Sequence, residues 1–182
     1  MAKPFPAIND DHRDMIGRQH IFFTATAAAG ARINVSPRPT DCFRIIGPNK
    51  VAYRDLTGSG SETAAHLKVD GRMTILFCAF DGLPIILRLY GTGVSHPRGT
   101  ASYQSLIDEV FAGEQPPGTR QVVTLDVDLV QTSCGYGVPL FDYVGERQGL
   151  ARWAEQQGED ALKAYRDRKN RVSLDGLPAL IE

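Results

Sequence analysis

Two apolar runs flank the dipeptide Asp81-Gly82, and this arrangement constrains the fold more than any other feature of the chain. Residues 72–80 (RMTILFCAF) precede the dipeptide and residues 84–91 (PIILRLYG) follow it. Both runs have the composition of strands, and Asp-Gly readily adopts the positive φ angles of tight turns between antiparallel strands. The sequence therefore predicts a β-hairpin here and a sheet built by local antiparallel pairing.

Other strands surround this hairpin in the sequence. A strand is predicted over residues 120–132, where apolar residues at 123, 125, 127 and 129 alternate with polar ones, as in a strand with one solvated face. Four further strands, joined in pairs by turn-forming residues, are predicted over residues 20–27, 31–37, 42–46 and 50–56.

Helices are inserted between these strands and do not alternate with them. About seven strands joined mostly by hairpins favour an antiparallel barrel with peripheral helices, of the mainly β (α+β) class, over a doubly wound parallel sheet. A single domain is expected over residues 1–182, with a C-terminal helix and an extended arm over about residues 146–182. The four helices are predicted over residues 9–19, 62–68, 103–112 and 146–169.

The charge and the cysteines exclude several classes of function. With 20 basic and 21 acidic residues the formal net charge is −1, so no overall field attracts nucleic acid or an anionic membrane. No apolar run approaches the ~20 residues of a membrane-spanning helix, and the first six residues do not resemble a signal peptide. Three widely spaced cysteines without a CxxC pair argue against a disulfide framework and a zinc site. We expect a cytoplasmic protein without a metal.

A loop rich in glycine and hydroxyl groups runs directly into the second predicted helix. It carries hydroxyls at 57, 59, 61 and 63 and glycines at 58 and 60. One interpretation is a phosphate cradle, because helix amides and glycine backbone can approach an anion. The other is a capped turn, in which Ser59 or Ser61 is the N-cap and Glu62 favours the first turn. Neither the P-loop pattern nor GxGxxG is present, and on spacing alone capping is favoured.

Several isolated residues have both a structural and a functional interpretation. Arg38, at the end of a strand, is either a surface arginine or a bidentate phosphate ligand. Arg72 and Arg88 lie in apolar strands and are expected either to contact a ligand or to form ion pairs, for example with Asp55 or Asp126. The histidines show no motif that pairs one with the Cys134 thiol, so nucleophilic catalysis is disfavoured.

Five stretches in combination resemble the pyridoxamine 5′-phosphate oxidase-related group of FMN-binding split-barrel proteins. They are INVSPR, VAYRDLTGSGSETAAHL, GRMTILFCAFDGLPIILRLYG, VQTSCGYGVPLF and NRVSLDGLP. The resemblance implies a six-stranded antiparallel split β-barrel with peripheral helices. It also implies a homodimer that binds FMN at the subunit interface.

The resemblance also implies which residues contact the cofactor. In the oxidase a strand of the form Arg-x-x-x-x-Lys lies along the flavin, and here Ile33 stands at the arginine position and Arg38 at the lysine position. The oxidase binds the FMN phosphate through a basic pair just after a strand that ends in Tyr-Thr. This chain keeps the tyrosine as Tyr53, followed by Arg54, but TGSGSET replaces the basic pair. The residues implied in cofactor binding are Asn34, Val35, Ser36, Arg38, Tyr53, Thr57, Ser59, Gly60, Ser61 and Thr63, and, toward the partner's flavin, Gln131, Ser133, Cys134 and Tyr136.

The implied function is an FMN-dependent oxidoreductase of unassigned substrate, with a nicotinamide donor as one option. The substrate-phosphate residues of the oxidase have no counterparts between Ser95 and Ala112, so pyridoxamine phosphate oxidation is not expected. Two alternatives stay open. One is a flavin-binding or flavin-sensing module without turnover. The other is a split-barrel relative that binds deazaflavin, or haem through His66 or His96. No residue is assigned a catalytic role.

Overall fold

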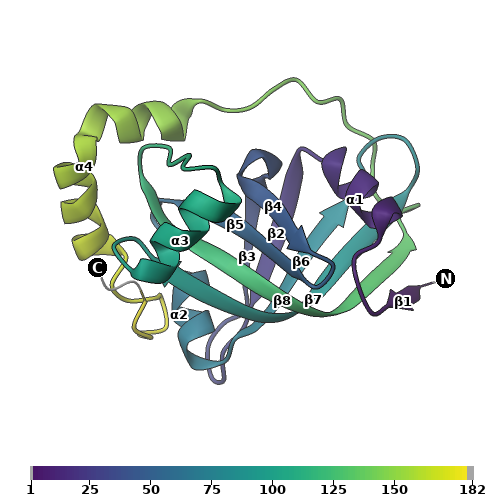
Figure 1. Ribbon diagram of the computed structural model, residues 1–182, viewed down its shortest axis with the longest axis horizontal. Helices are drawn as coiled ribbons and strands as arrows, with labels where there is room; N and C mark the ends of the chain where they lie inside the picture. Colours follow the sequence, from purple (N-terminus) through teal and green to yellow (C-terminus); the bar gives the residue numbers. More distant parts are fainter. Residues whose placement is uncertain (1, 180–182) are drawn as a thin grey trace.

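A computed structural model describes residues 2–179 of the chain (Figure 1). Helices are inserted between the strands and do not alternate with them, as the sequence predicts, and the approximate positions of the main elements are confirmed. The α-helices are α1 (Asp10–Gly17), α2 (Glu62–Val69), α3 (Ala101–Val110) and α4 (Gly149–Lys169), and Thr40–Cys42 form a short 3-10 helix. The strands are β1 (Lys3–Phe5), β2 (Ile21–Thr26), β3 (Asn34–Pro39), β4 (Phe43–Gly47), β5 (Lys50–Leu56), β6 (Arg72–Cys78), β7 (Ile85–Pro97) and β8 (Thr119–Cys134).

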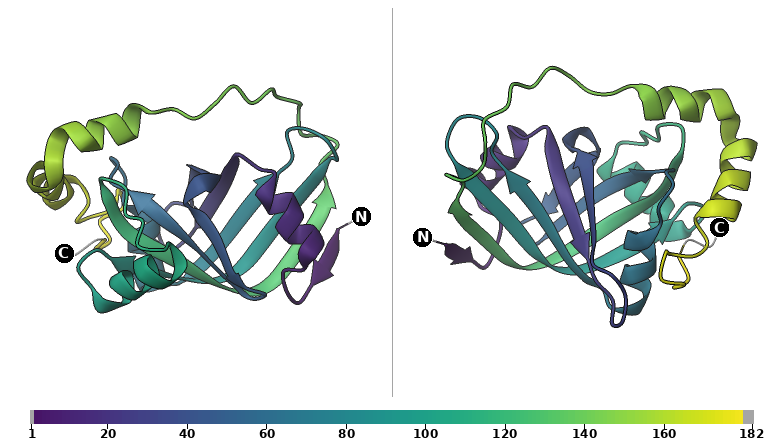
Figure 2. Two further views of the ribbon diagram at one scale, coloured as in Figure 1. Left: turned by 45° about the horizontal axis from the view of Figure 1, so that its top comes forward. Right: turned by 180° about the vertical axis from the view of Figure 1, so that it is seen from behind.

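The strands form one antiparallel sheet that curls into a half-barrel (Figures 1 and 2). Its order is β3-β2-β6-β7-β8-β5-β4, and the short β1 pairs with β8 beside this path. The expected split-barrel fold is confirmed, but the count of six strands is wrong: seven strands lie on the path among residues 2–179. Strand β1 was not predicted, because three residues are too few to show a period.

The two longest strands, β7 and β8, depart from the sequence prediction at a β-bulge. The pairs Tyr90↔Leu129 and Gly91↔Val127 leave Asp128 as an extra residue on β8. A Cβ at Gly91 would lie 1.9 Å from the Asp126 carbonyl oxygen, so this close approach requires glycine. The predicted alternation therefore ends at Val127, and Leu129 is 36% exposed.

The predicted solvated face of β8 is also partly wrong. Thr124 is only 3% exposed. The reason is α3, whose residues Tyr103, Ile107 and Phe111 pack with Val122 in a second cluster on the outer face of the sheet. Packing between distant segments has covered a face that the local pattern marks as polar.

The main core lies inside the curled sheet and positions the middle of β5. The rings of Phe22, Phe43 and Phe77 pack within 5.1–5.6 Å of one another, and Tyr53 packs against Phe22 at 5.6 Å. Tyr53 is fully buried. Because β5 is fixed in this way, the residues that follow Tyr53 along the strand have a defined orientation.

The C-terminal part lies at the α2 and α3 end of the sheet (Figures 1 and 2). Helix α4 begins at Gly149, three residues later than predicted, and Gly158 interrupts it with a positive φ of 72°. An irregular arm follows, in which Val172 bridges Pro178. The arm reaches α2, since the Leu174 amide donates to the Glu62 carboxylate at 3.0 Å. Within residues 2–179, no helix is long and apolar enough to cross a membrane.

Candidate functional site

A polar cleft with a volume of about 330 Å³ lies between β3, the β5–α2 loop and the first residues of β8. We call it the α2 cleft. It brings together seven of the residues implied in cofactor binding, from two segments that are about twenty residues apart. They are Asn34, Ser36, Arg38, Ser59, Gly60, Ser61 and Thr63.

The side chains of β3 reach the cleft because of the strand period. Asn34, Ser36 and Arg38 are alternate residues of β3 and therefore share one face of the strand. Val35, on the opposite face, is 61% exposed and does not line the cleft. The register of β3 on β2 places Ser36 opposite Thr24 and Arg38 opposite Phe22, so a polar strip runs beside the aromatic core.

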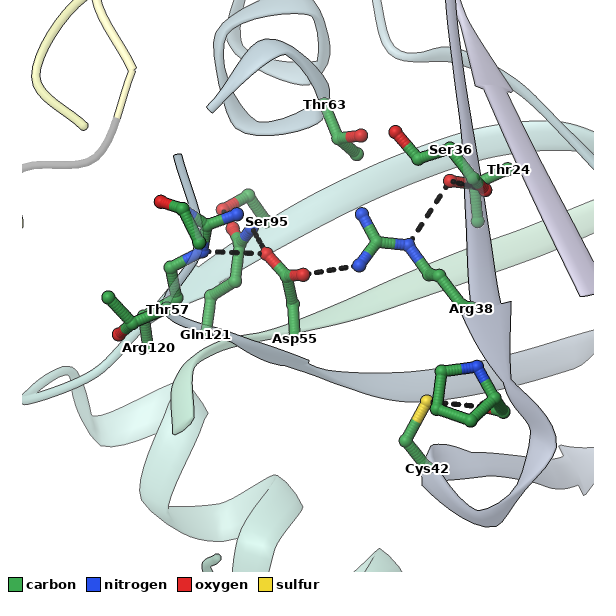
Figure 3. Close-up of polar contacts among 12 residues, drawn as sticks. Thr24, Ser36, Arg38, Cys42, Asp55, Thr57, Thr63, Ser95, Arg120 and Gln121 are labelled. Carbon is green, nitrogen blue, oxygen red and sulfur yellow. Dashed lines mark hydrogen bonds and ion pairs between the residues drawn. The ribbon is translucent and has the colours of Figure 1, made fainter. Parts of the chain in front are cut away.

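A buried carboxylate holds two arginines at the floor of the cleft (Figure 3). Asp55, whose side chain is 3% exposed, pairs with Arg38 through one oxygen. Its other oxygen accepts from Arg120 Nε at 2.9 Å and from Gln121 Nε2 at 2.6 Å. Arg38 Nε also donates to Thr24 Oγ1 at 3.2 Å. Arg120 Nη1 also donates to Asn170 Oδ1 at 2.9 Å, so each guanidinium is held in one orientation by more than one bond.

The charges of this group set its protonation state. Burial alone would raise the pKa of Asp55, but the charges of Arg120 and Arg38 and the Gln121 hydrogen bond outweigh it and hold that pKa well below its usual range. Burial alone would lower the pKa of Arg38, and the Asp55 charge reverses that effect and raises it. At neutral pH the group is thus one anion between two cations.

Arg38 retains a donor that faces the cleft. Its Nε and Nη1 are bonded to Thr24 and Asp55, and within residues 2–179 no group accepts from Nη2. Figure 3 shows this nitrogen directed toward the space between Ser36 and Thr63. Asn34 closes the same space, donating to Thr63 Oγ1 at 3.1 Å and accepting from Ser36 Oγ at 3.3 Å. An arginine donor and several hydroxyls therefore converge on one point.

The start of α2 forms the other wall, and its serine does not cap it. Ser61 is the N-cap residue, but its side chain makes no capping bond. Ser61 Oγ instead donates to the Val172 carbonyl at 3.4 Å. The expected positions of Ser61 at the N-cap and Glu62 in the first turn are confirmed, but the expected capping by a serine side chain is wrong. The amides of the first turn lack the side-chain acceptor that usually satisfies them.

Neither backbone conformation nor packing within the protein requires glycine at positions 58 and 60 of the loop. Neither Gly58 nor Gly60 has a positive φ, and no atom lies within 4 Å of where a Cβ would stand at either position. Backbone conformation and packing would thus tolerate alanine. Both glycines line the α2 cleft, where a bare backbone leaves room for a ligand.

Two other residues implied in cofactor binding lie behind the cleft. Thr57 is 1% exposed, and its hydroxyl donates to the Gly118 carbonyl at 2.8 Å. Tyr53 is buried in the core, and the Arg38 guanidinium lies 4.7 Å from its ring centroid. Their contacts support the loop and the arginine and do not reach the cleft surface.

The remaining implied residues lie at the opposite end of β8. Gln131 is ten residues beyond Gln121, about 33 Å along an extended strand. Gln131 accepts from Tyr90 at 3.4 Å, and Ser133 accepts from Arg88 at 3.1 Å. Tyr136 is 85% exposed, and Cys134 is also exposed. Within one chain, these residues do not join the α2 cleft.

Sequence reasoning missed Arg120, Gln121 and the role of Asp55. The hypothesis that Asp55 pairs with Arg72 or Arg88 is wrong, since Arg72 pairs with Asp70 and Arg88 contacts Ser133. The register of β5 on β8, which sets Asp55 opposite Gln121, brings the missed residues together. The sequence did contain one indication of this cluster, because Arg120 and Gln121 are polar residues at the start of the otherwise apolar strand β8. Within residues 2–179 no cluster of residues is suited to a metal ion.

Comparison with known proteins gives consistent results for sequence and structure. The sequence profile of the family described as pyridoxamine 5′-phosphate oxidase matches residues 8–134. The pyridoxamine 5′-phosphate oxidase family protein ustO of Aspergillus flavus is 39% identical over 97% of this chain and 77% of its own length.

Two solved structures share the fold at lower identity. HupZ of group A Streptococcus has a TM-score of 0.54 at 21% identity, and the match covers 67% of this chain and 91% of its own. A candidate pyridoxamine 5′-phosphate oxidase of Lactobacillus delbrueckii has a TM-score of 0.54 at 14% identity, and the match covers 69% of this chain and 94% of its own.

Proposed function

Because this chain belongs to the pyridoxamine 5′-phosphate oxidase family, we propose that it binds FMN with the phosphate in the α2 cleft and acts as a flavin-dependent oxidoreductase. One observation carries the proposal. It is the guanidinium of Arg38, held by Thr24 and Asp55 with one donor directed between Ser36 and Thr63.

The residues present fit a phosphate monoester. A dianion favours convergent charge-assisted donors and the positive end of a helix, and the cleft offers Arg38, Arg120 and the uncapped start of α2. Arg120 supplies a cation where the sequence lacks the family's basic pair. Ser59, on the exposed loop, adds a hydroxyl, and Gly60 leaves the backbone open. These groups are organised before any ligand arrives, which lowers the entropic cost of binding.

The second group of residues belongs to a homodimer in this proposal. Gln131, Ser133, Cys134 and Tyr136 lie too far along β8 to reach the α2 cleft of their own chain. In a two-fold dimer each chain can supply this end of β8 to its partner's flavin. The exposed Val35 on the edge strand β3, and Ile33 just before that strand, would also be covered by such a partner.

A bound flavin supplies hydride and electron transfer, and the protein supplies binding and orientation. The residues of the cleft hold the phosphate and so locate the ring system along β3. No group of the cleft is assigned as a proton donor, because hydride exchange with a flavin needs none. Haem is less well supported, because His66 is only 1% exposed and neither His66 nor His96 lines the α2 cleft.

The cofactor proposal is tested on the purified protein. We expect a yellow preparation with the flavin absorption near ~450 nm, or stoichiometric uptake of added FMN. Aerobic assays with NADH, NADPH and pyridoxamine phosphate then test for turnover. A colourless protein that takes up no FMN would contradict the proposal, and FMN binding without turnover of any donor would favour the flavin-sensing alternative.

Gly60→Ala separates a phosphate cradle from an ordinary turn. Because the φ of Gly60 is not positive and a Cβ would meet no atom within 4 Å, we expect unchanged stability or a gain of about 0.4–1 kcal/mol. FMN affinity is expected to fall, since the methyl group would project into the cleft. Gly17→Ala is the matched control, with equally open space and no positive φ but outside the cleft. Thermal melts and FMN titrations measure both effects, and equal FMN affinity of the two variants would refute the cradle.

A further inference from the structure

A second cavity, larger and more apolar than the α2 cleft, lies beneath an irregular segment of the chain. Residues 139–148 carry no helix or strand and connect β8 to α4; we call them the strap. Figures 1 and 2 show the strap as a long arc that stands away from the sheet. The cavity under it has a volume of about 640 Å³. Small-molecule sites typically have volumes of ~300–1,000 Å³.

Two aromatic contacts hold the strap over this cavity. The Tyr143 ring stacks on His20 with a centroid distance of 3.6 Å and an interplanar angle of 5°. The Phe141 ring lies 5.4 Å from Phe80, and its amide donates to the Phe80 carbonyl at 3.0 Å. The strap is therefore anchored at two points and leaves the space between it and the sheet open.

The strap does not fill the cavity with its own apolar side chains. Leu140 is 78% exposed and Val144 is 99% exposed. The apolar part of the walls is formed by Ile21, Phe80 and Leu150 together with Phe141 and Tyr143 of the strap, and charged residues, among them Arg18, Glu146 and Arg147, also line the cavity. Aromatic and aliphatic walls around an open volume favour a flat apolar ligand, because rings stack on aromatic side chains and displace water from apolar surface.

The cavity adjoins the α2 cleft. Pro37 and Arg38, at the end of β3, line both. A ligand under the strap would thus lie next to any cofactor bound along β3. The arginine that we assign to the phosphate also forms part of the boundary between the two sites.

We propose that the cavity under the strap is the substrate site, and that it takes a flat, largely apolar small molecule bearing a ring system. This inference rests on the proposed flavin function, which gives the neighbouring cleft its cofactor. The strap provides the aromatic wall, and the ligand's ring packs against the face of Tyr143 that is not stacked on His20. Specificity for ring-bearing substrates then comes from the strap and not from the residues that bind the cofactor.

The test uses the FMN-loaded protein and the neutral fluorescent probe N-phenyl-1-naphthylamine. We expect saturable binding of one probe per chain, with a shift of the flavin absorption band on binding. Tyr143→Ala removes a wall and Leu150→Trp fills the volume, and each is expected to weaken probe binding at least tenfold with FMN affinity unchanged. Leu174→Trp, at a leucine that is 77% exposed on the C-terminal arm, is the matched control and should bind the probe as the unmodified protein does.

Three results would overturn the inference. The first is probe binding that neither Tyr143→Ala nor Leu150→Trp weakens. The second is competition between probe and FMN, which would make the cavity part of the flavin's own site. The third is probe binding that leaves the flavin spectrum unchanged. The titration is repeated on FMN-free protein, so a failure to bind FMN contradicts the proposed function while the variants still decide whether the cavity is a binding site.

Discussion

Asp55→Ala is expected to lower the free energy of unfolding by about 3–5 kcal/mol, the usual cost of removing one partner from a buried ion pair. Asp55 is the single anion between Arg38 and Arg120, whose side chains are 13% and 6% exposed. Without it, two guanidinium groups lie close together with only neutral partners, and Gln121 Nε2 loses its acceptor. Urea denaturation at pH 7 measures the loss.

The control for this variant is Asp126→Ala. Asp126 pairs with Lys50 at 3.0 Å, but these side chains are 59% and 46% exposed. Water and salt screen such a pair, so the expected change is below about 1 kcal/mol. If the two variants lose equal stability, the buried charge cluster does not stabilise the fold as argued.

The stabilisation that Asp55 contributes is also expected to depend on pH. The pKa of Asp55 is lower in the folded than in the unfolded chain, so its contribution is fully present above the unfolded value of ~3.9 and is lost as pH falls toward the folded value. The difference in stability between the unmodified protein and Asp55→Ala should therefore be constant near neutral pH and shrink below about pH 4. Denaturation series at several pH values measure it.

Arg38→Met is expected to weaken FMN binding by about 2–3 kcal/mol, or roughly 30- to 150-fold in Kd. The variant keeps most of the side-chain volume but removes the charge and the donor that faces Ser36 and Thr63 (Figure 3). Because Arg120 still pairs with Asp55 at 2.9 Å, the carboxylate keeps one cation and a folded protein is expected. Titration of FMN by flavin fluorescence gives the affinity.

Two further variants serve as controls for the Arg38→Met measurement. Arg38→Lys keeps the charge without the planar fork and should give an intermediate loss. Arg72→Met removes an exposed arginine that contacts Asp70 outside the cleft, and it should leave FMN affinity unchanged. An Arg38→Met protein that is folded and binds FMN as tightly as Arg72→Met would show that the phosphate lies elsewhere.

The hairpins and their approximate limits could be predicted from the sequence because they depend on local chemistry. Gly47-Pro48-Asn49 and Asp81-Gly82 mark turns, and the flanking runs have strand composition. Strand β7 was predicted to end at Gly91, yet it continues to Pro97. Glycine usually weakens a strand, but here it allows the approach of β8 at the bulge, and that cause is visible only once the two strands are paired.

By itself, the sequence determined an antiparallel fold, because turn chemistry and strand period act over a few residues. Its resemblance to the oxidase family, and not those local patterns, placed Asn34, Ser36, Arg38 and the loop that begins α2 in a common hypothesis. Only the tertiary structure decided that Ser61 does not cap α2, that Thr57 faces the interior, and that Arg120 and Gln121 reach Asp55 from 65 and 66 residues away. Those contacts depend on strand register and on the docking of the C-terminal arm. Both are fixed by packing between segments that are far apart in the sequence, and no local sequence pattern indicates that such segments meet.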